Sequence, residues 1–411
     1  MRIAIVRGPN LNPFEMQSYL PLAQEHRLFG FATPDAPLRE SDARMAVTLL
    51  RSPAELAAKA PARWRRPVYQ LLSHGLGPAR NWMFGLEQRL RGMDIIHTAE
   101  TFNGYSLQAL RAKRRWGGTL IVTCWETIPF NFERGPLGRY VKARLRAEAD
   151  HFIAVTGKAR DCLRAEGVEL DRISVIPVGV ELNRFRPGEG DKALAGEMGL
   201  RPGVPTILFV GRLVQEKGVY DLLRALPLLQ GDFGLQADLL MVGEGRERAR
   251  LMREAKRLGI EASVQIRPAL SYARMAEVYR LADIFVLPSK PTRVWEEQFG
   301  MVLVEAMASG VPLVATDCGA IAEVVGDAGL VAPPASPDKL ADALAKLLQT
   351  PELRNKLGEA GSLRAQRRFS HIEISRRIAE TYRLVAGGRG RTIDELRPVQ
   401  QEPQPLTGTR R

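Results

Sequence analysis

Residues Trp295–Thr316 read WEEQFGMVLVEAMASGVPLVAT, and two of the three acids, Glu297 and Glu305, stand on either side of Gly300. A helix that begins near Phe299 or Gly300 would leave Glu297 on the preceding loop and place Glu305 one to two turns inside, so that both carboxylates could face one ligand. Such a helix start also directs unpaired N–H groups and the positive end of the helix dipole at an anion, which glycine lets approach closely. Taken alone, the stretch is better explained as an amphipathic helix with two solvated acids, so other motifs have to distinguish the two interpretations.

Short continuous apolar runs alternate with helical patterns on both sides of this stretch. Such runs are typical of strands in a parallel sheet that is buried on both faces. In the second half they are TILFVGR, DLLMVGEG, SVQIRPA, DIFVLPS and PLVAT, and in the first half IAIV, DIIHT, TLIVTCW, HFIAVT and ISVIPVGV. This order predicts an α/β protein with two doubly wound, Rossmann-like domains. Their ligand should bind beyond the carboxyl ends of the strands, in a cleft between the domains.

Changes in composition predict the boundaries between the parts of the chain. We expect an N-terminal domain over residues 1–187, a linker rich in Gly, Pro and charge over 188–204, and a C-terminal domain over 205–369. A helix over 370–386 should pack back towards the N-terminal domain, and residues 387–411 should form a flexible tail. The region from Pro34 to Arg91 gives only a weak indication of several helices.

Composition narrows the class of protein. A chain of 411 residues with 45% hydrophobic residues is long enough for two globular domains. It has no long uncharged apolar run, and its start, MRIAIVRGPN, is more typical of a first strand than of a signal peptide, so we expect a cytoplasmic location. The three cysteines form no CxxC pair and give no indication of a zinc site or a disulfide framework. The net charge of +13 suits a phosphorylated ligand, an anionic membrane or nucleic acid, but no nucleic-acid-binding motif accompanies it.

The segment FVGRLVQEKG, residues 209–218, supplies a second motif. A strand ends at Gly211, and Lys217 stands at the opening of the next helix, where a cation opposes the helix dipole. A bound diphosphate would resolve this conflict, because Arg212 can hold two oxygens and Lys217 can neutralise a third. The alternative is a surface pair between Lys217 and Asp221, one helical turn apart. Together with the paired acids of residues 295–316, the segment favours a diphosphate site.

The order and spacing of these segments resemble those of the retaining nucleotide-sugar glycosyltransferases of family 4, which have the two-domain GT-B fold. The resemblance covers most of residues 149–316 and rests on ADHFIAVT with IPVGVELNRFRP, on VGRLVQEKG, MVGEG and VYRLADIFVLPS, and on EEQFGMVLVEAMASGVPLVAT with EVVGDAGLV. It implies a hexosyltransferase that moves a sugar from a nucleoside diphosphate sugar, most often a UDP- or GDP-sugar, to an acceptor hydroxyl with retention of anomeric configuration. No cofactor is implied. Because the sequence has no DxD pair, Arg212 and Lys217 would take the electrostatic role of a metal.

The resemblance also implies roles for individual residues. Arg212 and Lys217 would hold the diphosphate and stabilise the leaving group, Glu297 would contact the donor sugar, and Glu126 would be a further catalytic candidate. Glu305 would accept hydrogen bonds from the ribose. The remaining donor-binding candidates are Gly8, Gly243, Glu244, Arg267, Phe299, Gly300, Met301 and Val302.

The N-terminal domain departs from the family pattern at one position. A histidine often follows the strand that corresponds to TLIVTC, whereas Trp125 and Glu126 follow it in this sequence. Glu126 could contact the sugar or the acceptor, or it could cap a helix. His97 is a second candidate, although a lone histidine at a strand end is more often structural, and Gly8 could equally make a simple strand-to-helix turn. In the mechanism that the family implies, the leaving phosphate itself helps to take the acceptor proton, so a missing histidine does not exclude activity.

Other functions remain open at this stage. The chain could be a degenerate transferase that only binds a sugar nucleotide, or an epimerase or hydrolase on the same fold. The acceptor could be a sugar, a lipid-linked molecule or a small molecule. Two basic stretches with aromatic residues, ARWRRPVY over 62–69 and LRAKRRW over 110–116, could touch an anionic membrane at its inner face, although a solvated basic surface is the commoner explanation.

Overall fold

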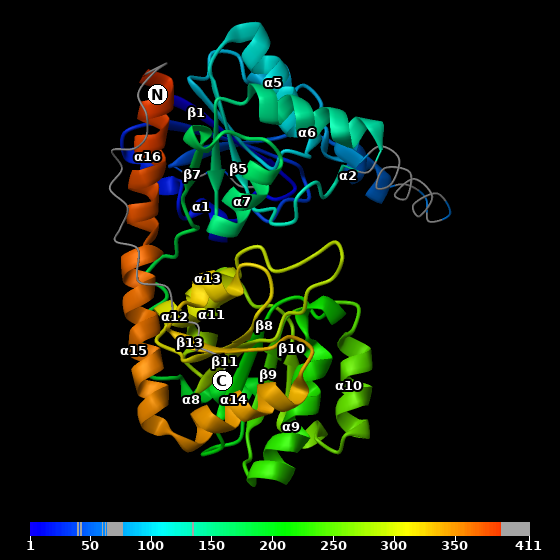
Figure 1. Ribbon diagram of the computed structural model, residues 1–411, viewed down its shortest axis with the longest axis vertical. Coiled ribbons are helices and arrows are strands. Elements are labelled where there is room, and N and C mark those ends of the chain that lie inside the picture. Colours follow the sequence, from blue (N-terminus) through cyan, green and yellow to red (C-terminus); the bar gives the residue numbers. More distant parts are fainter. Residues whose placement is uncertain are drawn as a thin grey trace, which may run out of the picture.

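The computed structural model describes residues 1–38, 41, 43–59, 61, 63, 77–133 and 135–387. It consists of two α/β domains, each built on a parallel sheet with helices around it (Figure 1). The predicted fold class of two doubly wound, Rossmann-like domains is therefore confirmed. Among the described residues, no helix is long and apolar enough to cross a membrane.

The N-terminal sheet has seven parallel strands in the order β3-β2-β1-β4-β5-β6-β7. The strands are β1 (Arg2–Gly8), β2 (Arg27–Ala32), β3 (Met45–Leu49), β4 (Ile95–Ala99), β5 (Thr119–Cys124), β6 (His151–Ala154) and β7 (Ile173–Val175). Side chains of β1 alternate between two cores: Ala4 packs on one face of the sheet, and Ile3 and Ile5 pack on the other. Burial on both faces explains why the sequence shows continuous apolar runs in place of alternation.

Helices and short 3₁₀ turns connect these strands. They are α1 (Pro13–Met16), α2 (Pro53–Ala58), α4 (Leu86–Arg89), α5 (Gly104–Trp116), α6 (Pro136–Glu148) and α7 (Gly157–Ala165), with 3₁₀ turns at Leu20–Gln24, Gly77–Asn81 and Leu170–Arg172. The region between Pro34 and Arg91, for which several helices were expected, contains α2 and α4, but it also contains β3, which was not predicted. As an edge strand with largely accessible side chains, β3 lacks the continuous apolar run that marks a buried strand.

The C-terminal sheet has six parallel strands in the order β10-β9-β8-β11-β12-β13. The strands are β8 (Thr206–Val210), β9 (Asp238–Val242), β10 (Val264–Arg267), β11 (Ile284–Leu287), β12 (Leu313–Thr316) and β13 (Gly329–Ala332). Its helices are α8 (Lys192–Met198), α9 (Val219–Phe233), α10 (Arg248–Arg257), α11 (Tyr272–Tyr279), α12 (Met301–Ala308), α13 (Ile321–Val325) and α14 (Pro337–Gln349), with 3₁₀ turns at Gln215–Lys217 and Glu261–Ser263. The segment 188–204, expected as a linker, contains α8, whose Leu194 and Met198 are buried in the core of this domain.

Two long helices follow the C-terminal sheet and run along one side of both domains, α15 (Pro351–Arg368) and α16 (His371–Gly387) (Figure 1). Helix α16 packs on the N-terminal domain, where Ile374, Ile378 and Tyr382 are buried in the same core cluster as Ile3 and Ile5 of β1. The chain thus returns to its first domain at the end, which ties the two domains together at a second place besides the crossing after β7. The expected tail beyond residue 387 lies outside the described residues.

Candidate functional site

The carboxyl ends of the two sheets face each other. Trp125, directly after β5, packs edge-on against Phe299, which precedes α12, with ring centroids 6.0 Å apart. Lys158, at the start of α7, forms an ion pair with Glu296 at 3.0 Å. Ligands of parallel α/β sheets bind at these strand ends, so the loops between the two domains are the candidate site.

Two glycines allow the loops of the C-terminal domain to pack closely. A Cβ atom on Gly243 would lie 1.9 Å from the carbonyl oxygen of Gly211, and one on Gly218 would lie 1.7 Å from that of Pro288. Gly218 also has a φ of +67°, which favours glycine. These approaches bring the turns after β8, β9 and β11 together, so the predicted donor loops form one surface.

Lys217 and Glu297 form the centre of this surface. Lys217 Nζ lies 2.5 Å from Glu297 Oε2, and the side chains are only 12% and 10% exposed. Ser289 Oγ donates a second hydrogen bond to the same oxygen at 2.9 Å. The Lys217 ammonium also lies 5.2 Å from the ring centroid of Trp295. The predicted alternative pair of Lys217 with Asp221 is not what the structure shows, since Lys217 is turned towards Glu297.

Arg212 stands at the edge of the same surface with 61% of its side chain exposed. Its guanidinium is 4.0 Å from Glu216, a loose contact that the two residues can give up at little cost. An exposed guanidinium and a largely buried ammonium on the same turn are suited to bind two neighbouring phosphates. Both residues lie in the segment between β8 and α9.

Helix α12 begins at Met301, directly after Gly300, whose φ of +82° is in the left-handed region. A Cβ atom there would lie 2.8 Å from Leu303 Cδ1, so glycine is needed for the chain to enter the helix. The first N–H groups of a helix have no partner within it, and those near Met301 and Val302 are available to an anion. Phe299 is buried and fixes this helix start against the core.

Glu305 lies inside α12, buried to 4% exposure. Its Oε2 accepts a hydrogen bond from Tyr279 OH at 2.7 Å. Burial raises the pKa of Glu305 to about 7, while hydrogen bonds from Tyr279 and Tyr272 act in the opposite direction. Tyr272 OH in turn accepts from Gln17 of the N-terminal domain at 3.1 Å. Glu305 is thus linked through tyrosines to the facing domain.

The remaining donor-binding candidates differ in what they offer. Gly243 directly follows β9, and its N–H donates to the carbonyl of Arg267 at 2.9 Å. Glu244 is exposed at the tip of the same turn. The guanidinium of Arg267, however, is turned towards α8, since its Nε donates to Met198 O at 3.1 Å. The backbone of Arg267 lies beside the turn at Gly243, whereas its side chain points away from that turn.

In the N-terminal domain, Gly8 ends β1 with a φ of +56°. A Cβ atom there would meet the ring of Tyr105 at 3.2 Å, so the glycine allows a tight packing contact as well as a turn.

His97 is fully buried: its Nδ1 lies 2.5 Å from Tyr382 OH of α16, and its Nε2 lies 2.7 Å from Thr123 Oγ1. Burial lowers the pKa of His97 well below its usual range. His97 therefore has a structural role, because it connects β4 to α16 and β5, and it is not part of the candidate site.

Glu126 holds its own loop together. Its Oε1 accepts hydrogen bonds from the N–H groups of Thr127 at 3.0 Å and Ile128 at 2.9 Å, and its Oε2 accepts from Asn131 Nδ2 at 3.0 Å. Of the two interpretations left open by the sequence, the structure supports a capping role, here of a loop. The carboxylate has little capacity left for a substrate.

Replacing Glu126 by alanine should therefore lower transfer less than replacing Lys217 by alanine does. Loss of three hydrogen bonds should loosen residues 126–131 and reduce the thermal stability, because the N–H groups of Thr127 and Ile128 lose their acceptor. Initial rates and melting temperatures of both variants would test this. The reverse order of activities would show that Glu126 takes part in the chemistry.

Glu100 is a residue of this edge that the sequence did not reveal. It follows β4, beside Trp125 and Glu126 after β5, and it has a φ of +65° although it is not glycine. Its Oε1 accepts from the Trp125 N–H at 2.8 Å, while its buried Oε2 has no hydrogen-bond partner among the described residues. Burial first, and then the neighbouring Glu126, raises the pKa of Glu100 to about 8. The sequence did contain a signal for this residue: Glu100 directly follows the buried strand β4, and Glu126 follows the adjacent strand β5.

The Glu100→Gln variant should become more stable than the wild type as pH rises. Glu100 ionises near 4.5 in the unfolded chain and near 8 in the folded protein. Between these values the unfolded state binds fewer protons, so the stability of the wild type falls with rising pH, and glutamine removes this loss. The difference in melting temperature should grow from pH 4.5 to pH 8. A constant difference across this range would contradict the assignment.

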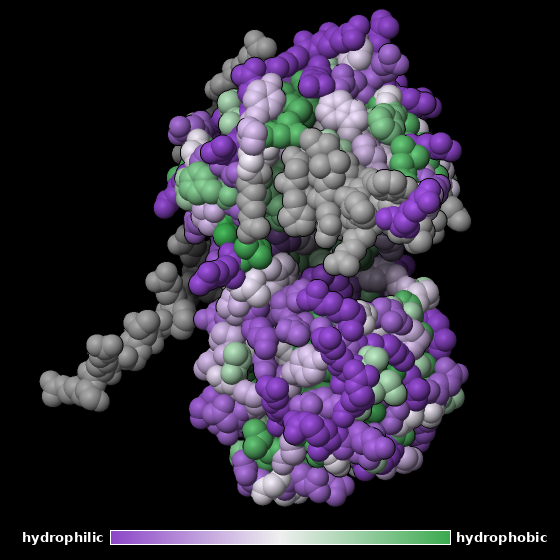
Figure 2. Space-filling model, turned by 90° about the vertical axis from the view of Figure 1, so that its right-hand side faces the viewer, coloured by the Kyte–Doolittle hydropathy of each residue, from purple (hydrophilic) through white to green (hydrophobic). Residues whose placement is uncertain are grey.

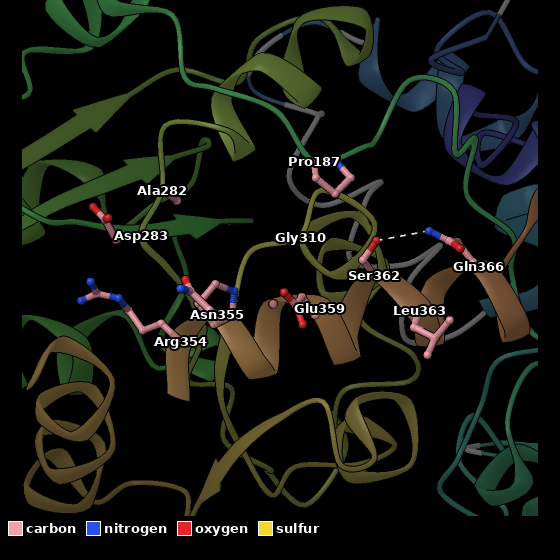
Figure 3. A pocket seen from close by; sticks show the side chains of 12 residues that line it. Pro187, Ala282, Asp283, Gly310, Arg354, Asn355, Glu359, Ser362, Leu363 and Gln366 are labelled. Atoms are coloured by element: carbon pink, nitrogen blue, oxygen red, sulfur yellow. Dashed lines mark hydrogen bonds between the residues drawn. The ribbon is translucent and has the colours of Figure 1, made fainter. Parts of the chain in front are cut away.

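A cavity of about 540 Å³ lies away from these residues, on the outer side of the C-terminal domain between α15 and the chain crossing near Pro187 (Figure 3). None of the predicted site residues lines it.

The basic stretch over 110–116 forms the second half of α5, where Arg114 Nε donates to Glu148 at 2.7 Å and Lys113 lies 2.7 Å from Asp150. The other basic stretch, over 62–69, lies almost entirely outside the described residues.

The structure has two facing domains with parallel sheets, the cations Arg212 and Lys217, and the acids Glu297 and Glu305 before and within α12. This is the arrangement of a nucleotide-sugar-dependent glycosyltransferase with the GT-B fold. Residues 193–364 match the model of glycosyl transferases group 1, and residues 24–184 match that of glycosyltransferase family 4. The D-inositol 3-phosphate glycosyltransferase of Segniliparus rotundus is 33% identical over 365 residues, which are 85% of this chain and 74% of the relative. The one of Xylanimonas cellulosilytica is 34% identical, over 70% of this chain and 71% of the relative. The chain belongs to glycosyltransferase family 4, as the resemblance predicted.

Solved structures agree on the fold. Sucrose-phosphate synthase from Thermosynechococcus elongatus is 21% identical, with a TM-score of 0.73 over 93% of this chain and 98% of the other. HepE of Anabaena, in complex with UDP-glucose, is 19% identical, with a TM-score of 0.71 over 93% of this chain and 99% of the other.

Proposed function

We propose that the protein transfers a hexose from a nucleoside diphosphate sugar to an acceptor hydroxyl, with retention of configuration and without a metal or cofactor. The observation that carries this proposal is the Lys217–Glu297 pair beside the start of α12, with Arg212 exposed next to it. This geometry supports a diphosphate held by two cations and by helix N–H groups, with an acid beside the sugar.

Each residue then has a distinct task. Arg212 and Lys217 neutralise the two phosphates and stabilise the charge that develops on the leaving group. The N–H groups at Met301 and Val302 share that charge. Glu297, released from Lys217 by the incoming diphosphate, accepts hydrogen bonds from hydroxyls of the donor sugar. The acceptor hydroxyl attacks from the face of the leaving phosphate, which takes its proton.

The similar proteins favour particular substrates for a first test. HepE of Anabaena is known in complexes with UDP and UDP-glucose, and the relatives are D-inositol 3-phosphate glycosyltransferases. A UDP-sugar, with a GDP-sugar as the alternative, is therefore the donor that we propose. D-inositol 3-phosphate is the first acceptor to try.

A thermal-shift panel of UDP-, GDP- and ADP-glucose, each with EDTA and with Mg²⁺, tests the donor. A ligand at a hundred times its dissociation constant adds about 2.7 kcal/mol, which raises the melting temperature by roughly 5–10 °C. One nucleotide should give this shift equally with and without the metal. No shift with any of them would contradict the proposal.

Product analysis by NMR then separates the competing functions. Transfer with an α-linked product from an α-linked donor supports a retaining transferase. Binding without turnover would indicate a degenerate transferase. Free sugar or an epimerised donor, formed at the same rate with and without an acceptor, would indicate a hydrolase or an epimerase.

A further inference from the structure

The loop between β5 and α6 exposes two phenylalanines on a backbone that large side chains rarely adopt. Phe130 and Phe132 both have a φ of +60°, and they are 53% and 47% exposed. A positive φ is unfavourable for a bulky residue, and such strain persists mainly where the surroundings enforce it and function uses it. Two strained and exposed aromatic residues within three positions therefore require an explanation.

The loop is held firmly from the side of the domain core. The N–H of Phe130 donates to Glu166 Oε1 at 2.7 Å. The buried Lys142 donates through Nζ to the carbonyl of Asn131 at 2.9 Å and to Glu166 at 2.6 Å. With the hydrogen bonds of Glu126 at the other end, these contacts fix the conformation of the loop. The exposure of the two rings is a built feature of the fold.

The ring of Phe132 stacks on that of Phe102, with centroids 4.1 Å apart and an interplanar angle of 21°. Phe102 follows β4, so the pair joins the carboxyl ends of two neighbouring strands. Between the two exposed rings, Asn131 Nδ2 donates to Val294 O of the facing domain at 3.2 Å. Val294 precedes Trp295, which covers Lys217. The loop that carries Phe130 and Phe132 therefore contacts the loop that leads to Trp295 and Lys217 in the facing domain.

We propose that Phe102, Phe130 and Phe132 form an acceptor platform, which binds the C–H face of a hydroxylated six-membered ring, a pyranose or a cyclitol. This inference rests on the proposed function. Aromatic planes bind the apolar face of such rings, while their equatorial hydroxyls stay free for polar partners at the edge. A membrane surface fits less well, because each exposed ring is about half covered and Asn131 ties the loop to the facing domain across the cleft.

The test measures UDP release from UDP-glucose, with and without methyl α-D-glucopyranoside, myo-inositol or D-inositol 3-phosphate. Phe132→Ala and Phe102→Ala should raise the acceptor KM about 5- to 10-fold and leave the donor KM and the acceptor-free hydrolysis unchanged. Phe132→Trp should restore the acceptor KM, whereas Phe132→Leu, which keeps an apolar side chain without a flat face, should not. Leu170→Ala is the matched control, because Leu170 is 53% exposed and precedes β7 at the opposite end of the sheet.

The outcomes separate this inference from the proposed function. A wild type that neither binds nor cleaves UDP-, GDP- or ADP-glucose contradicts both. If the wild type cleaves UDP-glucose but uses none of the three acceptors, or if Phe132→Ala keeps the wild-type acceptor KM, the platform alone is contradicted. Loss of binding to phosphatidylglycerol vesicles in Phe132→Ala, with an unchanged acceptor KM, would show that the rings bind lipid. Viewed from the side in Figure 2, hydrophobic residues form larger patches on the N-terminal domain than on the C-terminal domain, which makes this control necessary.

Discussion

Replacing Lys217 by alanine should lower kcat/KM for transfer about 100- to 1,000-fold while the protein stays folded. The ammonium is one of the two cations placed to neutralise the diphosphate, and a charge-stabilising group in a preorganised site contributes on this scale. Arg212 alone is too exposed to replace it, with 61% of its side chain in solvent. Steady-state kinetics with the donor chosen by thermal shift would measure the loss.

The control for this prediction comes from the partner of Lys217. In the single variant, Glu297 keeps its burial but loses its cation, which itself costs stability. The double variant Lys217→Ala with Glu297→Gln removes that unpaired charge and should recover the melting temperature without recovering activity. Wild-type turnover in the single variant would contradict the site assignment. A double variant that regains activity would show that the loss came from the stranded carboxylate.

The Lys217–Glu297 ion pair also shows what the sequence could and could not predict. Spacing placed both residues on loops at the carboxyl edge of one sheet, because the strand pattern around them is strong and the turn glycines are in place. It could not predict that they bond each other, since that contact joins the turn after β8 to the loop after β11. Long-range side-chain partners depend on packing that a periodic pattern does not encode.

The N-terminal domain was less predictable for a related reason. Its buried strands were recognised, but β3, an exposed edge strand, was missed. Glu126 was predicted as a catalytic candidate beside Trp125, and its hydrogen bonds to Thr127 and Ile128 correspond to the capping alternative that the sequence had left open. Glu100 was missed because its strained backbone and buried carboxyl become visible only once β4 and β5 are paired. Local signals predict elements, whereas capping and desolvation depend on tertiary structure.

The second large effect is expected for Glu305, whose replacement by alanine should reduce transfer by about 100-fold or more. We propose that its carboxylate binds the donor ribose, and the structure adds a second task, because Tyr279 OH donates to it at 2.7 Å in the core. Removing the acceptor leaves this buried hydroxyl unpaired, at a cost of about 1–3 kcal/mol. Loss of activity in Glu305→Ala could thus come from lost ribose binding or from a damaged core.

Two further variants distinguish these causes. Tyr279→Phe removes the hydroxyl and keeps the carboxylate, so it should lower the melting temperature and retain most of the activity. Glu305→Gln keeps an oxygen for Tyr279 and should fold normally, but a neutral amide accepts ribose hydroxyls less strongly than a carboxylate. Inhibition by UDP and by 2′-deoxy-UDP should therefore differ strongly in the wild type and in Tyr279→Phe, and only weakly in Glu305→Gln. Equal discrimination in all three proteins would show that Glu305 supports the helix and does not bind the donor.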